Sequence, residues 1–308
     1  MSIEACTTFL RELVTSDELK QQMKAMTDTG EMIALGRRHG YCFDARDFLV
    51  ASKALNAQGS APGARAQARP VMYDTSVFSH YEYDLLHVPG FERVIAELNN
   101  VKIQPSTVNM DHYRESFNQD DVQFTTMSPA ESGFSARYEE VMQSHWKGSP
   151  AGHDTLRRDF HLMNLDLHTE HARYEQYFQA KVRMIAHLEA FFGEEVRFSG
   201  SLWYPPLSYR LWHTNETQAG WRMYLIDFDN ASVGSPETAE KSFFRYMNPQ
   251  TKEIVTLEER PKLARFFKIE QEKEKLFWHC IVNATPYNRW SFGFVVPENW
   301  INRFHNPY

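Results

Sequence analysis

The second half of the chain holds a series of short segments rich in β-branched and aromatic residues, and this series constrains the fold more than any other feature. Proline and polar turns separate the segments, so each one predicts a short strand rather than a helix. Many short strands in succession are typical of a double-sheet jelly roll, the double-stranded β-helix of cupin-like barrels. The segments are VRFSGSLWY, SYRLWHT, WRMYLIDFD, KSFFRYM, LFWHCIV and RWSFGFVV.

The chain ahead of these strands predicts helices and loops that support the sheets. Residues 155–193 carry apolar residues at helical spacing and end near Gly193, so we expect one long helix that buttresses the sheet. Residues 71–150 mix short apolar runs with polar loops and are expected to supply lid and substrate loops. The predicted fold class is therefore α+β, with a jelly-roll domain over residues 71–308.

A small amino-terminal helical domain is predicted over residues 1–52. Thr15 to Glu18 offer a helix cap, and Gly40 is suited to end a later helix in the left-handed conformation. A bundle of roughly 50 residues is only marginally stable alone. Residues 53–70, KALNAQGSAPGARAQARP, contain almost no large apolar side chain and predict a flexible linker.

Composition and charge exclude several classes of protein. The chain has 308 residues, a net charge of −7 and a pI near 6.0, which give no general electrostatic reason to bind nucleic acid or an anionic membrane. Cys6, Cys42 and Cys280 are widely spaced and indicate neither a disulfide scaffold nor a structural zinc site. No apolar run approaches a membrane span and the first residues lack the order of a signal peptide, so we expect a cytoplasmic protein.

Residues 276–296 carry the most specific chemical pattern. His279 lies on one predicted strand, a polar turn follows, and the next strand begins with Arg289 and Ser291. Two antiparallel strands joined in this way place the imidazole and the guanidinium in one cavity. Imidazole binds iron and a guanidinium forks onto a carboxylate, so the pattern suits iron with a dicarboxylate co-substrate. Arg289 taken alone suits a buried structural salt bridge equally well.

A second strand-borne histidine, His213, lies 66 residues before His279. Jelly-roll iron sites commonly take a histidine, a carboxylate two residues later and a distal histidine far downstream. In this order and spacing, residues 195–297 resemble the Fe(II)/2-oxoglutarate-dependent oxygenases. The resemblance implies that His213 and His279 bind iron, with imidazoles within ~4 Å of each other. It also implies that Arg289 holds the distal carboxylate of 2-oxoglutarate, with Ser291 in support.

Asn215 stands where these oxygenases normally have an aspartate or a glutamate. An amide oxygen is a weaker ligand for Fe(II) than a carboxylate, and it leaves the site one negative charge short. Three alternatives stay open. Asn215 ligates the metal or lies beside it through water, Glu216 turns in as the carboxylate, or the vacant position accepts chloride, as in halogenases of this family. Those halogenases have Gly or Ala at this position, so hydroxylation ranks ahead of halogenation.

Other polar residues are weaker candidates. Arg222 precedes a strand that enters the same cavity, where it is a candidate partner for a carboxylate of substrate or co-substrate. His168 and His171 lie one turn apart, but no third ligand is in register and the surrounding charges indicate a solvated helix face. Asp227 and Asp229 alternate with apolar residues, and a solvated position at the edge of a sheet is the favoured interpretation.

The amino-terminal domain resembles the Nif11 family, the leader-peptide-like domains of ribosomal peptide precursors. The matching residues are SIEACTTFLRELVTSDELKQQM and, further on, ALGRRHGYCFDARDF, in which a His-Gly-Tyr turn precedes an acidic cap. The resemblance hints at peptide natural products, with the domain acting in cis or docking a partner.

Together these features predict an Fe(II)- and 2-oxoglutarate-dependent dioxygenase. The expected reaction is hydroxylation of an unactivated C–H bond in a peptide or amino-acid-like substrate, with O2 as the oxidant. No nucleic-acid or membrane partner is expected. A 2-oxoglutarate-dependent halogenase and a non-enzymatic cupin-like binding protein are the alternatives.

Overall fold

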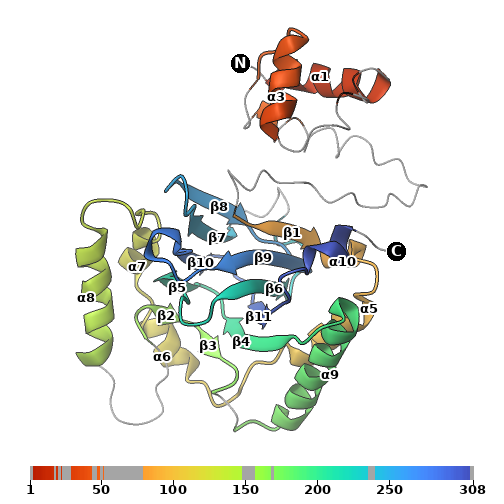
Figure 1. Cartoon of the computed structure of the whole chain (residues 1–308). Helices are drawn as coiled ribbons and strands as arrows, with labels where there is room; N and C mark the ends of the chain where they lie inside the picture. Colours follow the sequence, from red (N-terminus) through yellow and green to blue (C-terminus); the bar gives the residue numbers. More distant parts are fainter. Residues whose placement is uncertain are drawn as a thin grey trace. The chain divides into compact units, whose positions relative to one another are not determined.

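The computed structural model divides into two compact units, Met1–Gln67 and Ala68–Tyr308 (Figure 1). The linker predicted over residues 53–70 lies outside the described residues. The described residues are 3–16, 19, 22, 29–43, 47–48, 51, 79–147, 157–167, 170–234 and 240–305.

The described part of the first unit contains two helices, α1 (Ile3–Thr15) and α3 (Thr29–Arg38). Their apolar faces meet in a buried cluster that includes Phe9, Leu35 and Phe43. Apolar residues at helical spacing predict such a face, because burying it supplies most of the stability of a short helix. Gly40 follows α3 with a φ of +85°, the left-handed conformation expected there.

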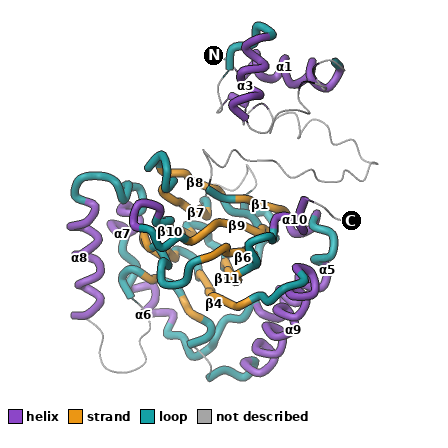
Figure 2. Tube along the Cα trace, in the orientation of Figure 1, coloured by secondary structure: helices purple, strands orange, loops and turns teal. Residues whose placement is uncertain are grey.

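The second unit is built on two antiparallel sheets that lie face to face, the jelly roll predicted from the strand series (Figure 2). The larger sheet has the order β1-β9-β6-β11-β4-β3, and the smaller sheet has the order β2-β5-β10-β7-β8. From β4 onward the chain repeatedly crosses between the two sheets, as a double-stranded β-helix requires. The strands are β1 (Tyr81–Asp84), β2 (Phe160–His161), β3 (Met163–Asn164), β4 (Arg197–Tyr204), β5 (Ser208–His213), β6 (Gly220–Phe228), β7 (Ser242–Met247), β8 (Ile254–Glu258), β9 (Leu263–Ile269), β10 (His279–Asn283) and β11 (Arg289–Val295).

The predicted strand series is confirmed, and its six segments form β4, β5, β6, β7, β10 and β11. The sequence did not reveal β9, because its side chains are apolar on nearly every position and Arg265 interrupts them near the centre. β9 is buried on both faces and pairs with β6 along seven residues, so it is a central strand.

β10 and β11 do not form the expected antiparallel pair. β10 pairs with β5 and β7 in the smaller sheet, whereas β11 pairs with β4 and β6 in the larger sheet. The loop that joins β10 to β11 therefore passes from the smaller sheet to the larger sheet. His279 and Arg289 consequently stand on opposite sheets rather than side by side on one.

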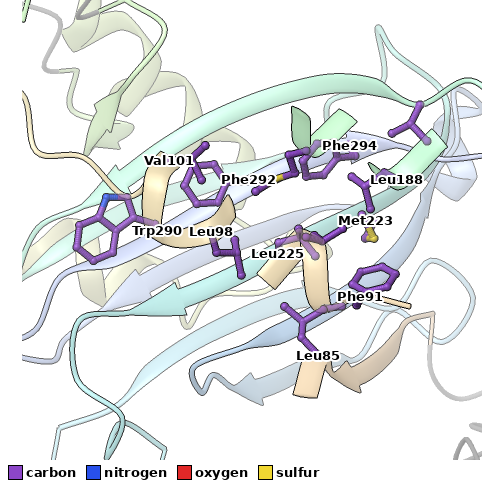
Figure 3. Close-up of a cluster of buried hydrophobic side chains, with 14 of the residues drawn as sticks. Leu85, Phe91, Leu98, Val101, Leu188, Met223, Leu225, Trp290, Phe292 and Phe294 are labelled. Carbon is purple, nitrogen blue, oxygen red and sulfur yellow. The ribbon is translucent and has the colours of Figure 1, made fainter. Parts of the chain in front are cut away.

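Helices cover the outer face of the larger sheet. They are η1 (Leu85–His87), α5 (Glu92–Val101), α9 (Tyr174–Phe192) and α10 (Ile301–His305), and Figure 1 shows α5 and α9 beside the sheet. Figure 3 shows side chains from these helices meeting apolar residues of β6 and β11, among them Leu98, Leu188, Leu225 and Phe292. Burial of each such side chain stabilises the fold by about 1.5–3 kcal/mol, so this layer fixes the larger sheet.

The helix predicted over residues 155–193 is shorter than expected. α9 begins at Tyr174, ends at Phe192 and is followed by Gly193 with a φ of +75°. Residues 160–164 instead form the edge strands β2 and β3, so Leu162 is buried between the sheets. An apolar spacing of three or four residues cannot distinguish a helix from two short strands joined by a bend.

The smaller sheet has its own helical cover. Residues 79–147, expected to form lids and loops, are largely helical: α6 (Met110–Glu115), α7 (Gln119–Phe124) and α8 (Phe134–Lys147) follow α5. Phe124, Phe134 and Val141 pack against Leu211 and Val282 on the outer face of β5 and β10. Both sheets are therefore covered on their outer faces by helices.

Candidate metal centre and its cavity

The structure brings His213 and His279 together at the end of β5 and the start of β10. The two residues are register partners in the smaller sheet, and their ring centroids lie 3.9 Å apart. The Nδ1 of His213 lies 2.8 Å from the carbonyl oxygen of Leu211, and the Nδ1 of His279 lies 2.9 Å from that of Phe277. An Nδ1–H that donates to a carbonyl fixes the tautomer and leaves the Nε2 lone pair for another partner.

Burial keeps both imidazoles neutral. It lowers the pKa of His279 to about 3, and it also holds the pKa of His213 well below its ordinary value. Nearby arginines, Arg210 first among them, act in the same direction. Metal ligation requires neutral imidazole, so the pair is in the ligating protonation state at neutral pH. The Nε2 of His213 is buried and has no hydrogen-bond partner among the described residues.

Asn215 lies beside the two histidines in a left-handed conformation, with a φ of +58° that asparagine tolerates better than most residues. Its Nδ2 lies 3.3 Å from the Nε2 of His279, and its Oδ1 accepts a hydrogen bond of 3.2 Å from Arg210. A metal ion and the amide N–H thus compete for the same imidazole lone pair. The side chain of Glu216 is exposed, and its charge acts on Tyr138.

Arg289 already forms an ion pair with a carboxylate of the same chain, that of Glu259. Its Nε and Nη2 donate to the two oxygens of Glu259 at 2.6 and 2.8 Å, and both side chains are fully buried. Arg265 and Ser242 also donate to Glu259, each at 2.8 Å. Burial alone would raise the pKa of the Glu259 carboxyl, but Arg289 and Arg265 outweigh this and lower it to about 2.

Sequence analysis missed Glu259 altogether. It directly follows β8 in the polar run Glu258-Glu259-Arg260, where nothing marks one glutamate as buried. The pattern around Arg289 left a structural salt bridge open, and the two-pronged contact with Glu259 is such a bridge.

A cavity of about 260 Å³ opens between the inner faces of the sheets. Of the predicted site residues, Asn215 and Ser291 line it, whereas His213, His279 and Arg289 do not. None of the described residues that line it is an aspartate or a glutamate. Its polar lining includes Arg210, Asn215, Gln218, Arg222, Tyr224 and Ser291.

These residues fit a divalent metal at the histidine pair and a small anion in the cavity. Two neutral imidazoles with available Nε2 atoms suit iron, but no group of three or more His, Cys, Asp or Glu gathers anywhere in the described part of the chain. The described residues would therefore contribute no negative charge to a metal bound there. An anionic co-ligand bound beside the imidazoles would supply it.

The remaining sequence candidates have structural roles. Asp227, expected at a solvated edge, is instead buried and forms ion pairs with Lys102 and Lys262. Asp229 accepts hydrogen bonds from Asn288, as an edge position would allow. His168 lies outside the described residues.

Comparison with protein families gives a match for the first unit. Residues 1–48 match the Nif11 domain, which confirms the resemblance drawn from the sequence of that segment. No match to this chain was found among curated proteins. No helix within the described residues is long and apolar enough to cross a membrane.

Solved structures similar to this chain include several oxygenases. A prolyl-4-hydroxylase from Pseudomonas putida is 13% identical with a TM-score of 0.28, over 66% of this chain and 99% of that one. The α-ketoglutarate-dependent carbocyclase SnoK from nogalamycin biosynthesis is 16% identical with a TM-score of 0.27, over 58% and 83% of the chains. EctD from S. alaskensis is 12% identical with a TM-score of 0.27, over 64% and 80%. Similarities at this level say nothing about the ligands of this chain.

Proposed function

We propose that this chain is an Fe(II)- and 2-oxoglutarate-dependent oxygenase that hydroxylates a peptide or amino-acid-like substrate in the cytoplasm. The single observation that carries the proposal is the pair of neutral imidazoles of His213 and His279, whose ring centroids lie 3.9 Å apart. Their Nδ1 atoms are anchored on backbone carbonyls, an arrangement typical of metal-ligating histidines.

In this proposal His213 and His279 hold the iron through Nε2, and Asn215 occupies the third protein position. When bound, Fe(II), 2-oxoglutarate and O2 supply the oxidation: one oxygen atom enters succinate as CO2 is lost, and the other becomes the substrate hydroxyl. The protein binds, orients and excludes water. Ser291 lines the cavity as a hydroxyl donor for the co-substrate, and the aromatic interior keeps the centre dry.

The site makes metal binding depend on the co-substrate. Two neutral imidazoles and an amide provide no charge, and Arg210 beside Asn215 disfavours a bare cation. A carboxylate from 2-oxoglutarate offsets both effects. We therefore expect Fe(II) to bind much more tightly once 2-oxoglutarate is present.

The substrate proposal rests on the first unit. A Nif11 domain ahead of an oxygenase-like unit suggests peptide tailoring, with the domain docking a partner or acting in cis. This association makes a peptide the first substrate class to test. Amino acids are the second.

A second candidate, a cupin-like binding protein, is favoured by the Glu259–Arg289 pair and by Asn215. These residues remove two features that an oxygenase of this kind normally has: a carboxylate on the metal and a free guanidinium. Such a protein would bind a small anion between the sheets without turning it over.

Anaerobic titration of Fe(II) with 2-oxoglutarate, followed by admission of O2, tests the proposal. We expect His213→Ala and His279→Ala to lose metal binding, because each removes one of only two imidazole ligands, whereas His187→Ala, on the distant helix α9, retains it. Full Fe(II) occupancy in either ligand variant contradicts the assignment.

Product analysis separates the candidate functions. Succinate formation with a substrate gain of one oxygen atom supports hydroxylation, and a chlorinated product in the presence of chloride supports the halogenase alternative. Binding of 2-oxoglutarate without succinate formation across peptide and amino acid substrates supports the binding protein.

A further inference from the structure

Four arginines stand on the inner faces of the two sheets, and two of them are neutralised. Arg265 donates to Glu82 at 2.9 Å and to Glu259 at 2.8 Å, and Arg289 forks onto Glu259. Arg260, which is more exposed, also lies 3.8 Å from Glu82. Each of the two buried arginines, Arg265 and Arg289, is thus already paired with a carboxylate and is not free to bind a ligand.

Arg222 on β6 has no such partner. Its side chain is 2% exposed, its Nη2 donates to the carbonyl oxygen of Gln218, and its Nη1 has no hydrogen-bond partner among the described residues. No described carboxylate lies within ion-pair distance of it. Burial accordingly lowers the pKa of Arg222, and the opposing interaction with Tyr224 is smaller. A buried guanidinium without a partner is strongly unfavourable unless an anion forms an ion pair with it.

Arg222 lines the cavity, and the rest of the lining favours an anion. Arg210 lines it too, and it is bonded to the Asn215 amide and to no carboxylate among the described residues. Ser291 and Tyr224 add hydroxyl groups. The described lining therefore places two cations and no acid around a space of about 260 Å³, which lies near the small end of ligand cavities and suits a compact metabolite.

The interactions of Arg210 and Arg222 show that the cavity lies near the pair His213 and His279. Arg210 contacts Asn215, which contacts His279, so Arg210 belongs to the end of the cavity next to the imidazoles. Arg222 also acts electrostatically on His279 and disfavours its protonated form. A dicarboxylate bound in this cavity would bring two negative charges to two uncompensated cations.

We propose that Arg222 binds the far carboxylate of the 2-oxo acid co-substrate, and that Arg289 serves as a structural ion-pair partner of Glu259. This inference rests on the proposed function for the identity of the co-substrate. The recognition itself is that of a small dicarboxylate by a buried guanidinium, and it needs no metal.

Calorimetric titration of the full-length, metal-free protein with 2-oxoglutarate and with succinate tests this assignment. We expect Arg222→Gln to weaken both affinities roughly tenfold to a hundredfold, as loss of a charge-assisted contact does. Arg222→Lys keeps the charge and should recover part of the affinity. Pyruvate lacks the far carboxylate. It should therefore bind with the same affinity to the Co(II)-loaded wild type and to the Co(II)-loaded Arg222→Gln variant.

Two controls report on charge and folding. Arg245→Gln removes a half-buried arginine from the smaller sheet, where it stacks over Phe243 outside the cavity, and should leave dicarboxylate affinity unchanged. Arg289→Lys loses one of the two hydrogen bonds to Glu259 but retains a cation for it, and because Arg289 does not line the cavity the dicarboxylate affinity should stay within about threefold of wild type.

A third variant tests the cavity without altering charge. A Cβ built on Gly200 meets nothing within 4 Å, so Gly200→Leu should fill the space and abolish dicarboxylate binding while the protein stays folded.

The outcomes separate this inference from the proposed function. Unchanged affinity in Arg222→Gln, a larger loss in Arg289→Lys, or no dicarboxylate binding by the wild type overturns the assignment of Arg222. Arg222-dependent binding of succinate together with Fe(II) occupancy that ignores His213 and His279 upholds the anion site and overturns the oxygenase.

Discussion

At the scale of single residues, Asn215 would determine how much charge the protein supplies to the proposed metal centre. It stands two residues after His213, and its amide lies between His279 and Arg210. An aspartate there would remove the N–H that competes for the imidazole lone pair. It would also supply the missing negative charge.

We predict that Asn215→Asp raises the affinity for Fe(II) or Co(II) without co-substrate by at least about tenfold. Asn118→Asp adds the same charge at the cap of α7, where aspartate is an equally good cap, and should leave metal affinity unchanged. Anaerobic metal titration measures both. Equal affinities in Asn215→Asp and the wild type would show that position 215 does not face the metal.

At the scale of elements, β4 and β11 form the floor of the cavity through a pair of glycines. Gly200 and Gly293 are register partners, yet their surroundings differ. A Cβ on Gly293 would lie 2.7 Å from the Oγ of Ser199 and 2.9 Å from the ring of Tyr224. A Cβ on Gly200 would meet open space. The backbone at Gly293 is thus closely packed, whereas the space beside Gly200 is open to a ligand.

We predict that Gly293→Ala lowers the free energy of unfolding by about 1–3 kcal/mol, because the methyl group overpacks the strand. Gly200→Ala, its matched control, should be neutral or stabilise by up to about 1 kcal/mol, because alanine reduces the freedom of the unfolded chain. Urea denaturation measures both. Equal losses in the two variants would contradict the open space at Gly200.

At the scale of the whole molecule, burial of neutral histidines ties the stability of the second unit to pH. His161 stacks on Tyr113 with ring centroids 4.1 Å apart, and burial lowers its pKa to about 4. The unfolded chain takes up a proton near pH 6.5, where folded His161 does not. Its contribution is therefore fully present above about pH 6.5 and is lost as the pH falls toward 4.

We predict that His161→Phe, which keeps a flat ring against Tyr113, reduces the loss of stability between about pH 7 and pH 5 by roughly 2 kcal/mol. Denaturant unfolding of metal-free protein at the two pH values measures the difference from the wild type. Identical pH dependence in the two proteins would mean that His161 is protonated in the folded state.

The strand series by itself determined the jelly roll, because alternation of apolar and polar residues over short segments leaves few ways to bury a core. The same sequence picked out His213, Asn215 and His279 as candidate ligands, since their order and spacing can be read directly along the chain. The length of α9 was overestimated, because residues before Tyr174 share an apolar spacing that fits both helices and bent strands.

Only the tertiary structure decided which arginine is paired. Glu259 reaches Arg289 from the position after β8, 30 residues away in the sequence, and no local pattern predicts that contact. Arg222 was one candidate among several until burial and the cavity set it apart. Local alternation locates most of the strands along the chain. Neutralisation of a buried charge depends instead on which distant residues the fold brings within hydrogen-bond distance, and that is a property of the whole molecule.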